Sequence, residues 1–356
     1  MIQSAREKGD WRLNREIALA SIFVHIVTFN NKNTIEPCLR ALVAQEKVSH
    51  LKVVVTDNNS SDDTLDHVAK FLSETVSVHT NSANIGFAAA HNWGVARFLE
   101  SDADFLVILN PDVALERNAL SELSDGFQRW PSFGAATGLL LRSDGSLQPL
   151  QPEIIDSAGI EFTPQFRHLD RFAGRLVRDV KIEEGEVQGA TGAYLAIRRK
   201  FIERVSLDAG SNSALFKLYP SLREGAKERK QLFDEAFFAY REDAELALRG
   251  GLLGERFVFI PRSRGAHQRQ VTPERRSSLA PQINKLGVRN RFLLQLAVFS
   301  WRHHWRWFLG GIIWRNLVVI LGVFFHERTS LGAFWELFLL LPRALQRRRE
   351  LFSKLD

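Results

Sequence analysis

Short apolar runs alternate with amphipathic segments along the first third of the chain, and this alternation limits the possible folds more than any other feature. The runs are rich in β-branched and aromatic residues, as expected for strands that are covered on both faces. Alternating strands and helices form right-handed crossover units with a parallel sheet. The sequence therefore predicts an α/β fold with an open, mostly parallel sheet. The expected strands are Ile22–Phe29, Leu51–Thr56, Val76–Thr80 and Phe105–Leu109, and the expected helices are Thr34–Gln45, Asp63–Ser73 and Phe87–Glu100.

Small polar or acidic residues follow each of the four expected strands. The four loops are Thr28–Asn31, Asp57–Asp62, Asn81–Phe87 and Asn110–Asp112. Open α/β sheets bind ligands outside the carboxyl ends of their strands, so we expect these loops to meet at one edge. The turn preferences of Asn, Asp, Ser and Gly explain any single loop equally well. Four such loops together favour a site for a polar ligand.

Two common phosphate-binding patterns are missing from the sequence. No G-x-G-x-x-G follows the first expected strand, which argues against a dinucleotide, and no G-x-x-x-x-G-K-[ST] occurs, which excludes a P-loop enzyme. Asp57 is suited to accept hydrogen bonds from a ribose or a base. Asp112 is suited to a hard divalent cation, which takes oxygen ligands and bridges phosphates. Asn110-Pro111-Asp112 can also open a helix over Val113–Phe127, and the two roles are compatible.

Three later segments carry further candidate residues. Val187–Arg199 places small residues before an apolar stretch, which suits close approach of a ligand but also an ordinary tight loop. Phe233–Arg249 is a stronger signal, because Glu242-Asp243 interrupts it before an apolar pattern resumes. An acidic pair at a helix start is favourable in the helix dipole, and it is also where a general base would be held. Phe257–Ile260 is expected to be a strand, followed by a lone His267, a residue type that is more often structural than a ligand.

Together these motifs resemble the inverting A-type nucleotide-sugar glycosyltransferases called family 2, and more closely their bacterial rhamnosyltransferase-like branch. The resemblance runs from about residue 21 to residue 291. Thr28-Phe29-Asn30 is similar to the opening motif of the family, and Asp57–Asp62 to its nucleoside-binding loop. Asn84–Phe87, with Asn92 and Gly94, matches the motif beside that loop. Each match alone is weak, but the set is specific.

The resemblance also implies roles for the acidic residues and His267. Asn110-Pro111-Asp112 stands where the family carries its metal motif, and His267 where it carries a late metal ligand for Mg²⁺ or Mn²⁺. Asp243 of the Glu242-Asp243 pair corresponds to the general base. The implied nucleotide contacts are Thr28, Asn30, Asp57, Asn59, Asn84, Gly86, Phe87 and Asn110, and the implied sugar or acceptor pocket is Gly189, Thr191, Gly192, Ala193 and Glu242.

This sequence departs from the family pattern at two positions. The metal motif offers one carboxylate instead of two or three, which predicts a weakly held cation. Ala244-Glu245 follows the acidic pair where the branch usually has a hydrophobic residue and Asp, which affects acceptor contacts more than the base.

The implied activity is a metal-dependent, inverting transfer of a sugar from a nucleotide donor to a cell-envelope polysaccharide or lipid-linked acceptor. The resemblance favours dTDP-rhamnose as donor, with UDP-sugars as the alternative. Another nucleotide-sugar enzyme, such as a nucleotidyltransferase, should carry a basic Gly-rich loop after the first strand, and Thr28–Asn33 is neither basic nor Gly-rich. A non-catalytic binding protein should have lost the acidic residues, whereas Asp57, Asp112 and Asp243 are all present.

The C-terminal part of the chain has a different composition from the rest. From Arg262 onward it carries 17 Lys and Arg against 5 Asp and Glu, and it contains five of the eight Trp residues. Phe308–Phe325 is apolar over 18 residues, but Arg315 and Asn316 interrupt it. A spanning helix needs roughly 20 apolar residues and is penalised by a central Arg, so binding at the surface of an anionic bilayer is favoured. A core-covering or oligomer-forming subdomain is the alternative.

These observations predict three regions and a location. Residues 1–20 form a polar extension without a signal peptide, residues 21–270 the catalytic domain, and residues 271–356 a basic helical region for membrane-surface association or homo-oligomerisation. No nucleic-acid-binding module accompanies the basic residues. The single Cys38 fits a reducing compartment. We therefore expect a cytoplasmic protein, peripheral on the inner face of the cytoplasmic membrane.

Overall fold

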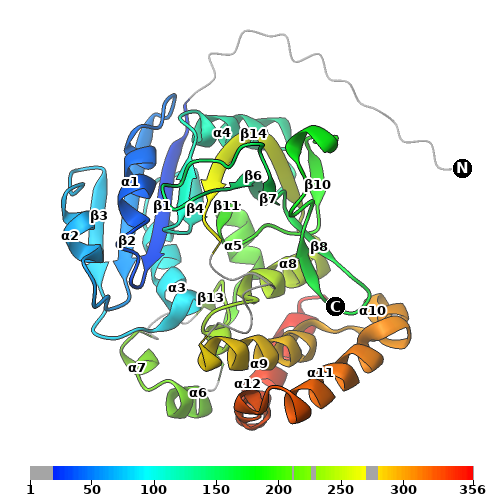
Figure 1. Ribbon diagram of the computed structural model, residues 1–356. Coiled ribbons are helices and arrows are strands. Elements are labelled where there is room, and N and C mark those ends of the chain that lie inside the picture. Colours follow the sequence, from blue (N-terminus) through cyan, green and yellow to red (C-terminus); the bar gives the residue numbers. More distant parts are fainter. Residues whose placement is uncertain (1–18, 211, 226–229, 270–279, 356) are drawn as a thin grey trace, which may run out of the picture.

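A mixed sheet of ten strands forms the centre of the computed structural model, which describes residues 19–210, 212–225, 230–269 and 280–355 (Figure 1). The main strand order is β10-β14-β6-β11-β4-β1-β2-β3, with β5 paired to β14 and β7 to β6. β11 lies antiparallel between β4 and β6, so β6 and β14 run in the same direction as β1 to β4. The strands are β1 (Ser21–Thr28), β2 (His50–Asp57), β3 (Val76–Thr80), β4 (Phe105–Leu109), β5 (Val113–Leu115), β6 (Ala135–Arg142), β7 (Ile155–Ser157), β10 (Gly185–Val187), β11 (Tyr194–Arg198) and β14 (Phe257–His267).

Helices cover both faces of this sheet, and the two faces have separate cores. Strand residues such as Ile22 and Val24 pack with α1, α2 and α4, whereas Phe23 and Leu106 pack with α3, α5 and α8. Neighbouring residues of a strand point to opposite faces, so continuous apolar runs are required here. The predicted open α/β sheet is confirmed. The covering helices are α1 (Ile35–Val43), α2 (Thr64–Ala69), α3 (Gly86–Leu99), α4 (Ala119–Arg129), α5 (Arg199–Val205) and α8 (Glu242–Leu252).

The strand register brings the polar loops together at one edge of the sheet, as predicted. Thr28 pairs with Asp57, and Asp57 pairs with Thr80, so the carboxyl ends of β1, β2 and β3 lie side by side. Leu109, the last residue of β4, is paired with Ile26. All four strands therefore deliver their following loops to the same edge.

One local expectation is wrong, and one expected strand is longer than predicted. Val113–Phe127 is not one helix, because Val113–Leu115 forms the strand β5 against β14 and α4 begins only at Ala119. The strand expected at Phe257–Ile260 continues to His267, because β14 pairs first with β6 and then also with β5. Neither partner strand is adjacent in the sequence, so local pattern alone does not reveal these pairings.

The C-terminal helices pack against the body of the molecule. Leu293 and Leu294 of one helix and Leu340 and Leu351 of another belong to the same buried cluster as the α3, α5 and α8 face of the sheet. Two small paired-strand elements lie nearby, β8 with β9 and β12 with β13. The elements are α9 (Pro281–Val298), α10 (Trp301–Trp307), α11 (Ile313–Phe325), α12 (Gly332–Ser353), β8 (Ile160–Phe162), β9 (His168–Asp170), β12 (Leu207–Asp208), β13 (Lys230–Gln231), α6 (Ser213–Leu218) and α7 (Leu222–Gly225).

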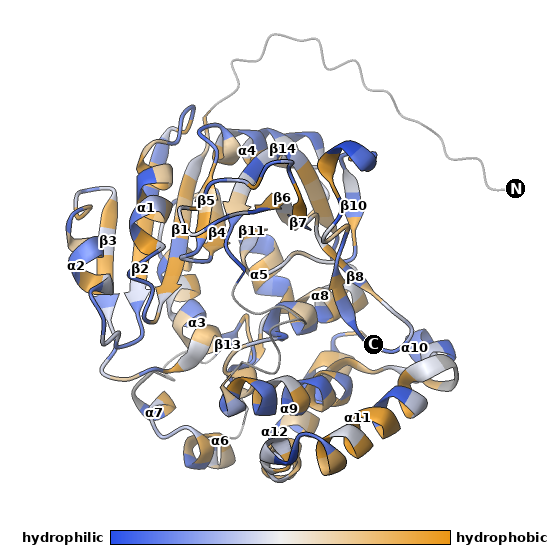
Figure 2. Cartoon of the chain, in the orientation of Figure 1, coloured by the Kyte–Doolittle hydropathy of each residue, from blue (hydrophilic) through white to orange (hydrophobic). Residues whose placement is uncertain are grey.

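Apolar side chains remain exposed on α11 and α12. Trp314 is 71% exposed and Trp335 is 63% exposed, and further apolar side chains are exposed on both helices. Apolar residues are prominent on α11 in Figure 2. Within the described residues, no single helix has the length and apolar character of a membrane span. Ile313–Phe325 and Arg328–Ser353 meet those criteria only as a pair bent by 110°. We call the following set the apolar face: Ile313, Trp314, Leu317, Val318, Leu321, Phe324, Phe325, Leu331, Trp335, Phe338 and Leu345.

Candidate active site

The first two polar loops are joined by hydrogen bonds around a buried carboxylate. Asp57 is fully buried and accepts hydrogen bonds from Thr28 Oγ1 at 2.7 Å and from the backbone N–H of Ser60 at 2.8 Å. Asn30 Oδ1 accepts from the backbone N–H of Ser61 at 2.8 Å. Asn30 and Asn59 have φ angles of 57° and 63°, a left-handed conformation that Asn tolerates better than most residues. The predicted nucleotide-binding residues of β1 and β2 therefore form one ordered rim, with Asp57 holding it together from inside.

The start of α3 forms the next part of the rim. Asn84 Oδ1 accepts a hydrogen bond from the backbone N–H of Gly86 at 2.8 Å. Gly86 has a φ of +82°, and a Cβ at this position would lie 2.6 Å from the carbonyl oxygen of Phe238, so glycine is required. Phe87 follows and lies against Gly192, where an added Cβ would be 3.3 Å from its ring.

The segment of small residues at positions 189–193 connects this rim to the acidic pair Glu242-Asp243. The backbone N–H of Gly192 donates to Asp243 Oδ2 at 3.0 Å. Asn110 is tied to the same segment, since its N–H donates to the carbonyl of Ala193 at 3.0 Å. Thr191 is buried. Gly189 instead packs against α8, where an added Cβ would lie 2.4 Å from Ala247 Cβ, so helix packing accounts for this glycine.

Glu242 and Asp243 occupy the first turn of α8, as the sequence predicts. Asp243 accepts hydrogen bonds from the N–H groups of Gly192 and Ala244, at 3.0 and 2.7 Å, and remains partly exposed. Glu242 is buried, and among the described residues its Oε2 has no hydrogen-bond partner. Burial and repulsion from Asp243 raise the pKa of Glu242 to about 8. Burial also raises the pKa of Asp243, against the hydrogen bonds from Gly192 and Ala244. At neutral pH the two carboxylates therefore share one proton, and Asp243 is the accessible, hydrogen-bonded member of the pair.

Asp112 and His267 also meet, at the paired ends of β5 and β14. Val113 is the register partner of His267, which sets Asp112 Oδ1 3.4 Å from His267 Nε2. On its other side, His267 Nδ1 lies 2.7 Å from Asp156 Oδ2. Burial would lower the pKa of His267, but Asp112 and Asp156 outweigh burial and raise that pKa to about 9. Without a cation, His267 is therefore protonated at pH 7 and forms a buried ion pair.

The residues at this position fit a divalent cation. Asp112 Oδ1 is buried without a hydrogen bond among the described residues, and its 3.4 Å separation from His267 Nε2 is longer than a normal hydrogen bond. Asp156 orients the imidazole, as carboxylates do for histidine ligands. No group of three or more His, Cys, Asp or Glu side chains within the described ranges is arranged for a metal. Two protein ligands are nevertheless sufficient for Mg²⁺, which commonly takes further ligands from phosphates and water.

The backbone immediately before the acidic pair is strained. Phe238, Tyr240 and Arg241 have φ angles of 63°, 71° and 73°, which side chains of this size rarely adopt. Each such residue costs on the order of 1–3 kcal/mol and persists only where neighbours impose it. Asn290 of α9 imposes it here, because its Nδ2 lies 2.8–2.9 Å from three carbonyl oxygens, those of Phe237, Ala239 and Tyr240.

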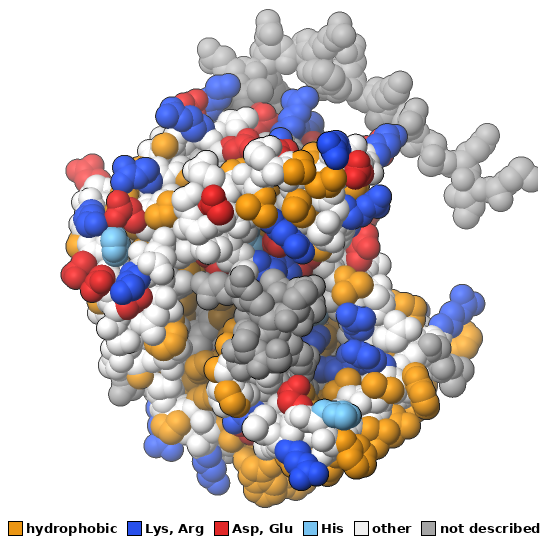
Figure 3. Space-filling view, viewed as in Figure 1, with side chains coloured by type: hydrophobic (Ala, Val, Ile, Leu, Met, Phe, Trp, Pro, Cys, Tyr) orange, Lys and Arg blue, Asp and Glu red, His pale blue; other side chains and the backbone are white. Residues whose placement is uncertain are grey.

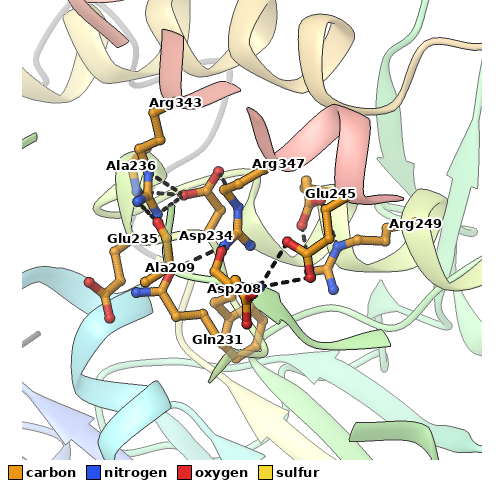
Figure 4. Close-up of polar contacts among 12 residues, drawn as sticks. Asp208, Ala209, Gln231, Asp234, Glu235, Ala236, Glu245, Arg249, Arg343 and Arg347 are labelled. Carbon is orange, nitrogen blue, oxygen red and sulfur yellow. Dashed lines mark hydrogen bonds and ion pairs between the residues drawn. The ribbon is translucent and has the colours of Figure 1, made fainter. Parts of the chain in front are cut away.

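A second buried contact anchors the beginning of the same loop. Asp234 is buried with Arg343 and Arg347 of α12, at 2.7 and 3.2 Å (Figure 4). The two guanidinium groups hold the pKa of Asp234 well below its usual range against the effect of burial. We call Asp234–Arg241 the catalytic loop. Its path to Glu242 and Asp243 depends on α9 and α12, which come from the region that the sequence assigned to membrane or subunit contacts.

Sequence reasoning missed Asp156 and Asn290. The signal for Asp156 was a carboxylate within an otherwise apolar segment, Ile154-Ile155-Asp156, which resembles the context of Asp112. Asn290 lies between Arg289 and Arg291 in an apolar helix, and all three are buried. Polar residues buried together within a helix need partners, and this need is the pattern that could have identified them.

The chain is similar to known proteins in sequence and in fold. The model of glycosyl transferase family 2 matches residues 23–205. N-acetylglucosaminyl-diphospho-decaprenol L-rhamnosyltransferase of Mycobacterium tuberculosis (strain CDC 1551 / Oshkosh) is 26% identical over 276 residues, covering 73% of this chain and 80% of the relative. The protein of the same name from strain ATCC 25618 / H37Rv matches equally.

Solved structures show the same fold at low sequence identity. S. aureus TarS 1-349 in complex with UDP-GlcNAc matches with a TM-score of 0.53 at 14% identity, over 94% of this chain and 88% of that chain. GalNAc-T7 with UDP, GalNAc and Mn²⁺ also matches with a TM-score of 0.53 at 14% identity, over 88% of this chain, which spans 59% of the length of that chain.

Three findings define the class of protein. The central sheet has its polar loops at one edge, an acidic pair lies at a helix start, and a family model covers half of the chain. The chain belongs to glycosyl transferase family 2 and is a glycosyltransferase. The predicted family and enzyme class are confirmed. The roles assigned to single residues stay predictions.

Glu242 should make the stability of the protein depend on pH in an unusual direction. The pKa of Glu242 is about 8 in the folded protein, against an ordinary value of 4.5. The stability that comes from keeping Glu242 protonated is therefore complete below pH 4.5 and is lost as the pH rises through 8. Glu242→Gln keeps the side chain neutral at every pH. In urea denaturation at pH 8.5, its free energy of unfolding should exceed that of the parent by on the order of 2 kcal/mol, with little difference at pH 4.5. Glu100→Gln, at an exposed ion pair with Arg97, is the control. Identical pH profiles for parent and Glu242→Gln would contradict the assignment.

Proposed function

We propose that this glycosyltransferase transfers rhamnose, with inversion, from dTDP-rhamnose to a lipid-linked acceptor of the cell envelope. The observation that carries the proposal is the position of Asp243, an accessible carboxylate on a helix start, held by two backbone N–H groups beside the rim formed by β1, β2 and α3. The rhamnosyl donor and the lipid-diphosphate acceptor are suggested by the name of the mycobacterial relative. A UDP-sugar is the alternative donor, tested by the same assays.

The proposed reaction is a single displacement at the anomeric carbon. The acceptor hydroxyl attacks, its proton passes to Asp243, and the nucleoside diphosphate departs from the opposite face. Glu242 stays protonated and buried, so it does not compete for this proton and keeps a second negative charge away from the base. Asp57 orders the nucleoside-binding loop, and the N–H of Gly192 donates a hydrogen bond to the general base, Asp243.

Asp112 and His267 are the residues that would hold Mg²⁺ or Mn²⁺. A cation bound there would neutralise the charge that grows on the departing diphosphate. Binding must displace the His267 proton, whose pKa lies at about 9, so the metal affinity of this site should rise with pH.

The apolar face on α11 and α12 suits an anionic membrane surface. Within residues 280–355 no Asp or Glu is exposed, whereas Arg302 and Arg306 of α10 and Arg328 between α11 and α12 are exposed. Basic side chains contribute about 1 kcal/mol each near anionic lipid, and apolar burial contributes roughly 25 cal/mol per Å². We propose a cytoplasmic enzyme that lies on the inner surface of the cytoplasmic membrane, with no role for nucleic acid. Alternatively, the apolar face forms the contact between the subunits of a homo-oligomer.

Asp243→Asn should retain donor binding and lose transfer. An amide cannot accept the proton of the acceptor hydroxyl, and general-base catalysis contributes about 10²–10⁴ in rate. Turnover of dTDP-rhamnose with an acceptor lipid should fall at least a hundredfold, while calorimetric affinity for dTDP changes little. Thermal unfolding controls for the hydrogen bond lost to Gly192 or Ala244. A rate within tenfold of the parent would require another base.

Asp112→Ala should abolish metal-dependent turnover, because it removes the carboxylate of the proposed cation site. Thermal unfolding measures the stability lost with the buried contact to His267. Binding of Mn²⁺ in the presence of dTDP, followed by electron paramagnetic resonance, should weaken at least tenfold. Asp66→Ala, an exposed carboxylate on α2, serves as the control. Parent-like activity of Asp112→Ala with added Mn²⁺ would refute the metal assignment.

Membrane binding should have a salt-sensitive and a salt-resistant part. In vesicle flotation, the protein should bind anionic vesicles more strongly than neutral ones, and high salt should release it only partly. Trp314→Ser with Trp335→Ser should remove the salt-resistant part, whereas Leu72→Ser, an exposed apolar residue after α2, should not. Equal binding to neutral and anionic vesicles would refute the electrostatic half. A protein that stays in solution at low salt would leave the apolar face as an oligomer contact.

A further inference from the structure

Four arginines that the proposed reaction does not use gather between the catalytic pair and the C-terminal helices. We call them the arginine cluster: Arg167 in the β8–β9 turn, Arg241 directly before Glu242, Arg291 of α9 and Arg315 of α11. Their elements are joined by Arg291, which donates from its terminal nitrogen to the carbonyl of Gln165 and from Nε to Asn316 Oδ1, both at 3.1 Å. Lys and Arg side chains are visible between the upper body and the lower helices in Figure 3.

Three members of the cluster, buried Arg291, half-buried Arg315 and exposed Arg167, have no carboxylate partner among the described residues. Arg291 is 4% exposed, yet its hydrogen-bond acceptors are an amide and a backbone carbonyl, both uncharged. The Nε of Arg315 is buried without a hydrogen-bond partner among the described residues. Arg167, Arg291 and Arg315 make no ion pair within that part of the chain. Burial lowers the pKa of Arg291 to about 10, and the like charges of the other three members contribute.

Three other deeply buried arginines, unlike Arg291, pair with carboxylates. Arg249 pairs with Glu245 at 2.7 Å, Arg289 with Glu336 at 2.9 Å, and Arg343 with Asp234 at 2.7 Å. A buried charge without a partner is strongly destabilising, which explains why these three carry carboxylates. Buried Arg291 has no such carboxylate among the described residues, and the like charges of Arg167 and Arg315 lie beside it, so an anion from outside the protein is a partner that fits this charge distribution.

We propose that the arginine cluster binds the diphosphate of the lipid-linked acceptor. This inference rests on the proposed function and specifies how that same site recognises its second substrate. Guanidinium groups match phosphate oxygens in geometry and charge, and several together suit a diphosphate better than a single phosphate. Arg241 is adjacent in sequence to the catalytic pair, which sets the diphosphate beside the base that must reach the acceptor sugar.

The position of the cluster favours the acceptor over the donor as the source of the diphosphate. The nucleoside loops lie at the ends of β1 and β2, whereas α9 and α11 lie on the other side of α3 and α8 in Figure 1. Arg315 also follows Trp314, the most exposed residue of the apolar face. A diphosphate at Arg315 would therefore have its lipid chain at the helix proposed to lie on the bilayer.

The test uses Arg315→Gln. The Nε of Arg315 has no hydrogen-bond partner among the described residues, so its loss leaves no acceptor there without a donor. We expect the KM for a GlcNAc-diphospho-lipid to rise at least tenfold, with unchanged kcat for octyl N-acetylglucosaminide, which has no diphosphate. Arg291→Gln should behave alike if it folds, and Arg40→Gln, an exposed arginine of α1, should match the parent. Equal losses on both acceptors, or no loss on either, would overturn the proposal.

Two binding measurements separate the possible sources of the diphosphate and do not require turnover. Calorimetry of the full chain with farnesyl diphosphate should show binding that Arg315→Gln weakens at least tenfold, while the Kd for dTDP stays the same. Weaker dTDP binding with unchanged farnesyl diphosphate binding would assign the cluster to the donor and overturn the proposal, as would a parent that does not bind farnesyl diphosphate. Farnesyl diphosphate binding that depends on Arg315, in a protein that transfers no rhamnose, would refute the proposed donor and support the diphosphate site.

Discussion

The buried contact between Asp234 and two arginines of the last helix is the constraint on which the active site depends. It fixes the beginning of the catalytic loop, and Asn290 fixes its end by binding three carbonyl oxygens. Between these points the backbone adopts left-handed angles that the residues would not choose alone. Removing one partner of such a buried pair typically costs about 3–5 kcal/mol. The strain is therefore maintained by helices that lie more than forty residues further along the chain.

Burial determines how the two carboxylates of the catalytic pair divide their roles. Glu242 is enclosed, and burial with repulsion from Asp243 raises its pKa to about 8, whereas Asp243 is partly exposed and receives two N–H groups at the start of α8. His267 shows the opposite balance, since its two carboxylate neighbours outweigh burial and keep it charged. The protonation of these three side chains is therefore set by their surroundings and not by residue type alone.

The C-terminal helices link the proposed chemistry to the proposed location of the enzyme. One side of α9 and α12 belongs to the core and holds the catalytic loop, while α11 and the first part of α12 present the apolar face. The arginine cluster lies between these two sides. The basic residues of this C-terminal region are therefore divided among buried ion pairs, the arginine cluster and exposed positions.

The sequence by itself determined the sheet, the loop edge and the acidic pair, because strand and helix periodicity and turn chemistry are local properties. Thr28, Asp57 and Asp243 could be singled out for the same reason. Tertiary structure alone decided that Val113–Leu115 is a strand, that Asp156 orients His267 and that Asn290 and Arg343 hold the catalytic loop. It also decided which arginines are paired and which are not. These contacts join residues that are distant in the chain, and neither the burial of a charge nor its partner is encoded in the local pattern around it.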